Sequence, residues 1–321
     1  MPSTGELNQA DVVSGTVSDR VLCISADDLI GSNGNRFDEL VCSACLQTGF
    51  FYIDLTDSQR NLIAAALRQM ERFFALADDD DRKQSVKQGD QRDTGWVPRY
   101  TEPAYQPGTV SSLEAFDFDV NNLNSSHDDD WPKLADFRRD LTRCWNEYVN
   151  LANSILGVIA RAAGMQASFL QDNCNTHALS NMRLLNYAPD SIQTDQNVGI
   201  AAHTDFECIT LLYQTAAGLE LLDSNGDWLD APVEDGRIVV LLDDMLERWT
   251  NGAFKATGHR VRSTAEQRYS IVMFVAVNDE IVIEPLPQYV TDDLPARYLP
   301  ITQEQHIDNE VQRAKDNIAG T

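Results

Sequence analysis

Basic residues are scarce in this sequence. The 321 residues include 25 Lys and Arg against 50 Asp and Glu, which gives a formal net charge of −25 at pH 7. A field of this sign repels nucleic-acid phosphates and anionic lipid headgroups, so we expect no nucleic-acid partner. Long hydrophobic runs are missing too. The apolar run Ile271–Val277 is far shorter than the roughly 18 residues that a membrane span needs, so we expect no membrane partner.

Cysteine is also too infrequent for a disulfide scaffold, with six residues in the whole chain. Cys42 and Cys45 form a CxxC motif within a helical pattern, but no second pair completes a four-ligand zinc set. The motif therefore favours core packing over redox or metal chemistry. The first residues have neither the basic nor the apolar segment of a secretory signal, and we expect a cytoplasmic protein.

What the sequence does contain is an ordinary globular composition, with 43% hydrophobic residues. Two short strand-like runs flank a helical pattern in residues 21–54. Thr56 and Gln59 form a capping box, which predicts that a helix begins there. Over residues 133–164 the apolar side chains recur at intervals of three and four, which predicts one long amphipathic helix.

The pattern changes after about residue 180 to short apolar runs separated by turn residues, which is typical of a β-barrel or β-sandwich. Residues 85–132 have weak periodicity and are expected to form a long, partly structured excursion that lines a site. We expect a mostly β fold with flanking helices, divided into a mobile N-terminal arm (1–20), an α/β N-terminal region with the long helix (21–180), a β catalytic core (181–287) and a helical tail (288–321).

Two metal-capable side chains stand at His203 and Asp205, two residues apart and so on one side of an extended segment. His259 begins another strand-like run. Two neutral imidazoles and one carboxylate form the facial set that leaves open positions on Fe(II) in non-haem oxygenases. Spacing alone is weak evidence, because an HxD motif followed by a distant His also arises by chance.

Arg268 and Ser270 are again two residues apart on one strand-like run. A guanidinium can bind a carboxylate through two parallel hydrogen bonds, and the hydroxyl can donate a third. The alternative is an ordinary arginine on an exposed strand edge.

These motifs occur in the order His203-Thr-Asp, His259-Arg-Val and Arg268-Tyr-Ser. The combination resembles the isopenicillin N synthase-like branch of the 2-oxoglutarate and Fe(II)-dependent dioxygenases. The resemblance is closest over residues 182–287 and weaker over the N-terminal half. It implies that the β core is a double-stranded β-helix, or jelly roll.

The resemblance also implies the roles of individual residues. His203, Asp205 and His259 would be the iron ligands, and Arg268 with Ser270 would hold the distal carboxylate of 2-oxoglutarate. Tyr187 matches a tyrosine that contacts the cosubstrate in many relatives, and the alternative is a core aromatic.

The implied activity is oxidation of an unactivated C–H bond of a small molecule, with Fe(II), 2-oxoglutarate and O2, in secondary metabolism. Hydroxylation is the default outcome, and desaturation or cyclisation is also permitted. Two alternatives stay open: an iron-dependent oxidase that does not use 2-oxoglutarate, and a non-catalytic jelly roll that binds a small molecule. The residues indicate no particular oligomeric state.

Other residues receive simpler interpretations. His127, His177 and His306 have no partner set in the sequence and are expected at the surface. The substrate pocket is expected to draw on the excursion at 85–132, on the strand around Phe206 and on the last strands near Phe274.

Overall fold

A computed structural model gives the fold. It describes residues 21–30, 34–89, 94–101, 110–127, 130–174, 179–189, 197–223, 226–262 and 265–319. The N-terminal arm predicted over residues 1–20 lies outside the described residues. None of the helices in the described part of the chain is long and apolar enough to cross a membrane.

Two facing sheets form the centre of the molecule. The larger sheet has the order β1-β2-β12-β9-β14-β6-β5-β3, with bounds Cys23–Ser25, Phe50–Asp54, Arg237–Leu242, Ile209–Gln214, Arg268–Val275, Asn181–Tyr187, Glu114–Asp119 and Gly95–Val97. The smaller sheet has the order β11-β10-β13-β8, with bounds Trp228–Asp230, Leu219–Leu222, His259–Val261 and Ile200–His203. A short pair joins β4 (Val110–Ser111) to β7 (Asn197–Val198). This architecture confirms the predicted jelly-roll core.

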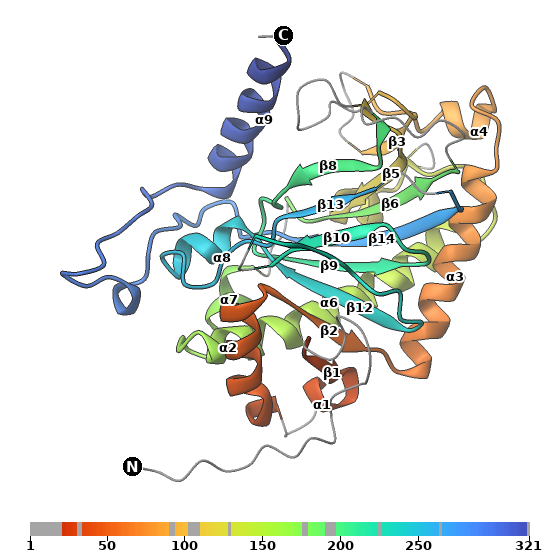
Figure 1. Ribbon diagram of the computed structural model, residues 1–321. Coiled ribbons are helices and arrows are strands. Elements are labelled where there is room, and N and C mark those ends of the chain that lie inside the picture. Colours follow the sequence, from red (N-terminus) through yellow and green to blue (C-terminus); the bar gives the residue numbers. More distant parts are fainter. Residues whose placement is uncertain are drawn as a thin grey trace.

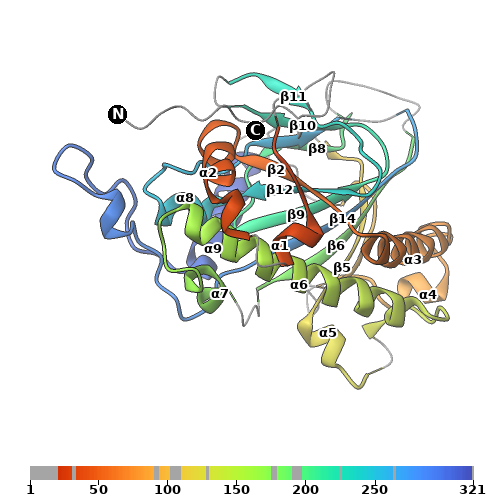
Figure 2. The ribbon, with the colours of Figure 1, turned by 90° about the horizontal axis from the view of Figure 1, so that it is seen from below.

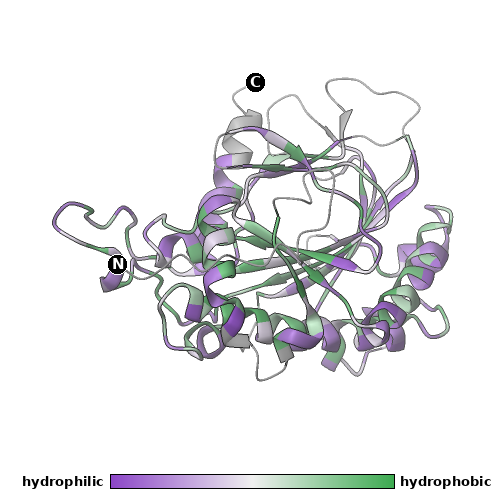
Figure 3. Ribbon diagram, turned by 60° about the horizontal axis from the view of Figure 1, so that its bottom comes forward, coloured by the Kyte–Doolittle hydropathy of each residue, from purple (hydrophilic) through white to green (hydrophobic). Residues whose placement is uncertain are grey.

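Helices α3 and α6, with α1, α2 and α7 beside them, lie on the face of the larger sheet that is turned away from the smaller sheet, whereas α9 projects from one end of the sheets (Figures 1 and 2). The helix bounds are α1 Ala26–Ile30, α2 Asp38–Gln47, α3 Asp57–Phe74, α4 Asp81–Gln84, α5 Val120–Asn124, α6 Phe137–Ala162, α7 Phe169–Asn173, α8 Asp244–Trp249 and α9 Gln303–Ala319. Hydrophilic residues lie on the outward faces of these helices, and hydrophobic residues fill the strands (Figure 3). The helices therefore supply one hydrophobic core, and a second, smaller core lies between the two sheets.

The helix ends follow from local chemistry. Thr56 caps α3 in the predicted capping box: its hydroxyl accepts from the Gln59 amide, and the Gln59 side chain accepts from the Thr56 amide. The predicted long helix is α6, which starts at Phe137 because Asp136 adopts a left-handed φ of 69°. Gly164, also with φ near +68°, ends this helix.

The N-terminal region completes the larger sheet. Strands β1 and β2 add to one edge beside β12, and β5 and β3 add to the other beside β6. Three short strands, β3, β4 and β5, fall within the partly structured excursion expected at residues 85–132. This arrangement brings residues from the first 120 positions to the wall of the space between the sheets.

A buried ion pair joins α4 to β5, next to the edge strand β3 of the larger sheet. The Lys83 side chain is 1% exposed, and its ammonium contacts the Glu114 carboxylate and lies 4.8 Å from the centre of the Trp96 ring. The same carboxylate accepts from Trp96 Nε1 at 2.6 Å and from Asn186 Nδ2 at 3.0 Å. Strands β3, β5 and β6 are thereby joined to α4 through one carboxylate.

Lys83→Met should lower the free energy of unfolding by about 3–5 kcal/mol, because it leaves the buried Glu114 carboxylate without its cation. Urea denaturation measures this change. Lys87→Met is the matched control, since Lys87 also lies near the Trp96 ring but is exposed. Equal denaturation midpoints for the two variants would contradict the role given to Lys83.

Candidate active site

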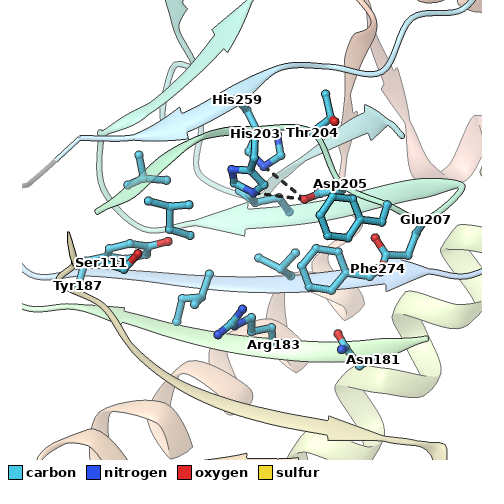
Figure 4. Close-up of a pocket in the computed structure, with 16 residues that line it drawn as sticks. Ser111, Asn181, Arg183, Tyr187, His203, Thr204, Asp205, Glu207, His259 and Phe274 are labelled. Atoms are coloured by element: carbon cyan, nitrogen blue, oxygen red, sulfur yellow. Dashed lines mark ion pairs between the residues drawn. The ribbon is translucent and has the colours of Figure 1, made fainter. Parts of the chain in front are cut away.

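A cavity of about 170 Å³ lies between the two sheets (Figure 4). Its walls combine strands of both sheets with the segment that follows β8. The lining residues are Ser111, Asn181, Arg183, Leu185, Tyr187, Ile200, His203, Thr204, Asp205, Phe206, Glu207, Leu212, His259, Val261, Val272 and Phe274. Ser111, Phe206 and Phe274 come from the three segments from which we expected the pocket residues.

The smaller sheet brings His203, Asp205 and His259 together. His203 ends β8 and His259 begins β13, and the two residues are direct cross-strand partners. Their ring centroids are 4.2 Å apart. Asp205 Oδ1 lies 3.4 Å from His203 Nε2 and 3.6 Å from His259 Nε2. One ligand atom from each residue therefore falls within 4.8 Å of the others, close enough to hold one metal ion.

Backbone contacts orient both imidazoles. His203 Nδ1 lies 2.8 Å from the Ala201 carbonyl, and His259 Nδ1 lies 3.1 Å from the Thr257 carbonyl. A carbonyl only accepts, so each Nδ1 carries the hydrogen and each Nε2 presents a lone pair. Both lone pairs face the Asp205 carboxylate, which is the tautomer that a metal requires.

The Thr210 hydroxyl orients the Asp205 carboxylate. Its Oδ2 accepts from the Thr210 hydroxyl at 2.7 Å, which leaves Oδ1 turned toward the imidazoles. The same hydroxyl oxygen lies 3.0 Å from Asp243 Oδ2. A hydroxyl has one hydrogen, so Asp243 must carry a proton of its own to complete this chain. Its burial, together with the nearby Asp205 and Glu207, raises the pKa of Asp243 well above its ordinary value, in agreement with that assignment.

The surroundings of Asp205 and His259 favour the protonation states that bind a metal, an ionised carboxylate and a neutral imidazole. Burial alone would raise the pKa of Asp205, but His259, His203 and the Thr210 hydroxyl outweigh it and lower the pKa to about 2. Burial lowers the pKa of His259, so its ring is neutral at pH 7. Burial and then the charge of Asp205 raise the pKa of Glu207, in the adjoining wall, to about 8.

Arg268 and Ser270 lie on β14, on the inner face of the larger sheet. Both are 0% exposed, so the alternative of an arginine on an exposed strand edge is wrong. Arg268 Nε donates to the Ala216 carbonyl at 3.2 Å, and Nη2 donates to Gln214 Oε1 at 3.0 Å. Within the described residues, Arg268 Nη1 and Ser270 Oγ are buried with no hydrogen-bond partner. Two adjacent unpaired donors suit an anionic ligand.

Tyr187 stands beside this pair. It is the register partner of Arg268 on β6, and its ring centre lies 4.6 Å from the guanidinium carbon. The residue is 3% exposed and also lines the cavity. Tyr187 is therefore both a buried core aromatic and a neighbour of the Arg268 guanidinium.

Sequence reasoning missed several groups at this site. Arg183 and Asn181 line the cavity from β6, and the signal was the alternation of that strand counted back from Tyr187. Asp243 is the residue before α8, but its side chain makes no cap hydrogen bond and instead lies beside Thr210.

The histidines outside the motifs have different surroundings. His127 is exposed, as predicted, and His177 lies outside the described residues. The surface position predicted for His306 is wrong. Its side chain is buried, with Nε2 2.7 Å from Asp244 Oδ2, because the first turn of α9 packs against α8 and against the ring of Phe206.

Comparisons with known families agree with this geometry. Residues 179–277 match the model of the 2OG-Fe(II) oxygenase superfamily, and residues 23–135 match the model of the non-haem dioxygenase in morphine synthesis N-terminal region. One relative is the 2-oxoglutarate-Fe(II) type oxidoreductase hxnY of Emericella nidulans, 29% identical over 86% of this chain and 84% of that protein. The 2-oxoglutarate-dependent dioxygenase tropC of Talaromyces stipitatus is 28% identical over 78% and 83%.

Solved structures show the same fold. A protein assigned to the 2OG-Fe(II) oxygenase family from Caulobacter crescentus superposes with a TM-score of 0.78 at 25% identity, over 91% of this chain and 99% of that one. A full-length protein of Neurospora crassa, solved in complex with alpha-KG, also gives a TM-score of 0.78, at 21% identity, over 96% and 98%.

The raised pKa of Glu207 predicts how stability depends on pH. Its folded pKa of about 8 exceeds the ordinary value of 4.5, so the protonated form is favoured by folding. This contribution is complete below about pH 4.5 and is lost as the pH rises through about 8. The Tm of the metal-free protein should therefore fall by several degrees between about pH 6 and pH 8.5, and Glu207→Gln should reduce that fall.

The measurement is a thermal melt in chelator at both pH values. Glu284→Gln, at an exposed position, is the matched control and should behave like the wild type. A Glu207→Gln protein that loses as much stability as the wild type would contradict the assignment.

Proposed function

Because this chain belongs to the 2OG-Fe(II) oxygenase superfamily, we propose that His203, Asp205 and His259 bind Fe(II) and that Arg268 and Ser270 bind 2-oxoglutarate. The enzyme is then a dioxygenase that oxidises a C–H bond of a small molecule. The observation that carries the proposal is the convergence of the three ligand atoms within 4.8 Å in the same inter-sheet space as two buried, unpaired donors.

The chemistry of the donors fits Fe(II). Two imidazole nitrogens and one carboxylate oxygen match the two-histidine, one-carboxylate set of non-haem iron oxygenases. Both Nε2 atoms already point at the ligand position, so little reorganisation accompanies metal binding. The Thr210 hydroxyl would hold Asp205 in its ligating orientation.

The donors around Arg268 fit a carboxylate. Arg268 Nη1 and Ser270 Oγ have no partner among the described residues, and a buried unpaired donor costs about 1–3 kcal/mol. A carboxylate of 2-oxoglutarate would accept from both atoms. Gln214 and the Ala216 carbonyl fix the plane of the guanidinium, so that its remaining edge is pre-oriented.

Bound Fe(II) supplies a centre at which O2 is activated at the expense of 2-oxoglutarate, which becomes succinate and CO2. The protein contributes position and enclosure. The sheets keep the reacting C–H bond beside the ligand set, and the apolar walls at Leu212 and Val272 limit water. Which C–H bond lies nearest decides the product, and hydroxylation is the default.

The proposal extends to partners and location. The substrate is a small molecule, because the site is enclosed between two sheets. A net charge of −25 disfavours nucleic acid and membrane surfaces, and we place the enzyme in the cytoplasm and in secondary metabolism.

Asp205→Ala should abolish retention of Fe(II), because it removes the anionic ligand and leaves two neutral imidazoles. Metal analysis after anaerobic loading and desalting measures retained iron per chain. Asp279→Ala, at an exposed position, is the control and should retain iron like the wild type. Full iron retention by Asp205→Ala would contradict the assignment of this ligand.

Arg268→Ala should raise the KM for 2-oxoglutarate by about 10- to 100-fold and leave iron retention unchanged, because it removes a charge-assisted contact worth roughly 1.5–3 kcal/mol. Succinate release at varied 2-oxoglutarate measures the KM. Ser270→Ala should give a smaller increase in the same direction. Turnover without 2-oxoglutarate, or an unchanged KM in Arg268→Ala, would instead favour an oxidase that does not use this cosubstrate.

A further inference from the structure

The cavity extends past the metal ligands to an end that the cosubstrate residues do not reach. Alternation along β6 places Asn181, Arg183, Leu185 and Tyr187 on its cavity side, and all four line the cavity. Tyr187 is the register partner of Arg268, whereas Arg183 lies four residues further along. At about 3.3 Å per residue, Arg183 stands about 13 Å from the cosubstrate end. Figure 4 shows Tyr187 and Asn181 at opposite sides of the cavity.

Arg183 provides a guanidinium below the metal ligands, between Tyr187 and Asn181 (Figure 4). It is the only arginine or lysine among the described lining residues, in a chain of net charge −25. Its Nε lies 3.2 Å from Asp117 Oδ1 on the neighbouring strand β5. Asp117 is in turn held by Gln88, whose Nε2 donates to Oδ2 at 3.0 Å. Gln88 thus holds the Asp117–Arg183 pair in place. The guanidinium points into the space below the metal ligands (Figure 4).

Hydrogen-bond acceptors lie next to this charge. Asn181 Oδ1 is buried and has no hydrogen-bond partner among the described residues. Asn181 is two residues from Arg183 on the same side of the strand, and Glu207 faces the same end of the cavity (Figure 4). A ligand with an N–H or O–H group would satisfy the orphaned amide oxygen.

Two phenyl rings complete this end. Phe274 is the register partner of Asn181 on β14, and Phe206 directly follows Asp205. Both rings line the cavity beside the metal ligands. Flat apolar faces of this kind favour a planar ring in the ligand, through offset or edge-to-face contacts.

We propose that Arg183 and Asn181 form the recognition site for the primary substrate, and that this substrate is a small planar ring compound with one carboxylate, for Arg183, and a neighbouring N–H or O–H donor, for Asn181. The ring lies against Phe206 and Phe274 with a C–H bond beside the metal ligands. This inference rests on the proposed dioxygenase function and adds the substrate class to it.

The selectivity follows from the arginine. A carboxylate binds a guanidinium through charge-assisted, often bidentate hydrogen bonds, whereas the carboxamide of the same ring offers one neutral acceptor and adds donors that face a cation. Loss of one charge-assisted contact corresponds to about a 10- to 100-fold weaker interaction. The enzyme should therefore distinguish a ring carboxylate from its own carboxamide by that factor.

The experiment uses full-length protein loaded anaerobically with Fe(II) and 2-oxoglutarate. The probes are hydroxybenzoates, hydroxycinnamates, indole carboxylates and pyridine carboxylates, each paired with its carboxamide, together with neutral and cationic ring compounds. Binding is followed by thermal shift without O2, and turnover by succinate formation with O2. We expect carboxylates to be preferred over their carboxamides by about 10- to 100-fold in kcat/KM.

Variants assign the preference to one side chain. Arg183→Met should remove the preference for the carboxylate while the loaded protein still binds iron and 2-oxoglutarate. Arg183→Lys should keep part of it, because the charge remains and the planar fork is lost. Arg313→Met, on the exposed face of α9, is the matched control and should match the wild type.

Three results would overturn the recognition site: carboxamides or neutral rings that bind as well as carboxylates, no binding of any ring carboxylate, or loss of iron and 2-oxoglutarate binding in both Arg183 variants, which would make Arg183 structural. The proposed function fails by a different result. A wild-type protein that binds neither Fe(II) nor 2-oxoglutarate would refute the dioxygenase itself, whatever the probes do.

Discussion

The cross-strand register of β13 on β8 is the constraint on which the site depends. It sets His259 directly opposite His203, and the two residues that follow β8 carry Asp205 to the same point. A shift of one residue would turn one imidazole to the other face of the sheet. Backbone carbonyls then fix both rings, and Thr210, on β9 of the opposite sheet, fixes the carboxylate. The smaller sheet therefore brings the three groups together, and packing of the larger sheet against it orients the carboxylate.

Several buried polar groups between the two sheets lack a hydrogen-bond partner in the described part of the chain. Arg268 Nη1, Ser270 Oγ and Asn181 Oδ1 are buried without hydrogen-bond partners in the described part of the chain. Such groups destabilise a fold unless a ligand completes them. The first two lie at one end of the inner sheet face and the third lies at the other, on either side of the metal ligands. The distribution of unpaired atoms thus agrees with the proposed cosubstrate end and the proposed substrate end of the site.

The proposed ligand set and the proposed arginine anchor could be recognised in the sequence, because an i, i+2 pair on a strand keeps both side chains on one face whatever the rest of the fold does. Thr56 and the end of α6 were predictable for a similar reason, since caps depend on neighbours in sequence. The burial of His306 was not, because it depends on Asp244, a partner far away in the chain. The cavity position of Arg183 follows from the alternation of β6, but its pairing with Asp117 also depends on a distant segment.

The most direct test of the shared metal centre is an anaerobic titration of the wild-type protein with Fe(II) in the presence of 2-oxoglutarate, followed by visible absorption. A metal-to-ligand charge-transfer band that saturates at one iron per chain is the predicted result, because one ferrous ion would hold the two imidazoles, the carboxylate and the keto acid together. A protein that stays colourless and retains no iron after desalting would contradict the account.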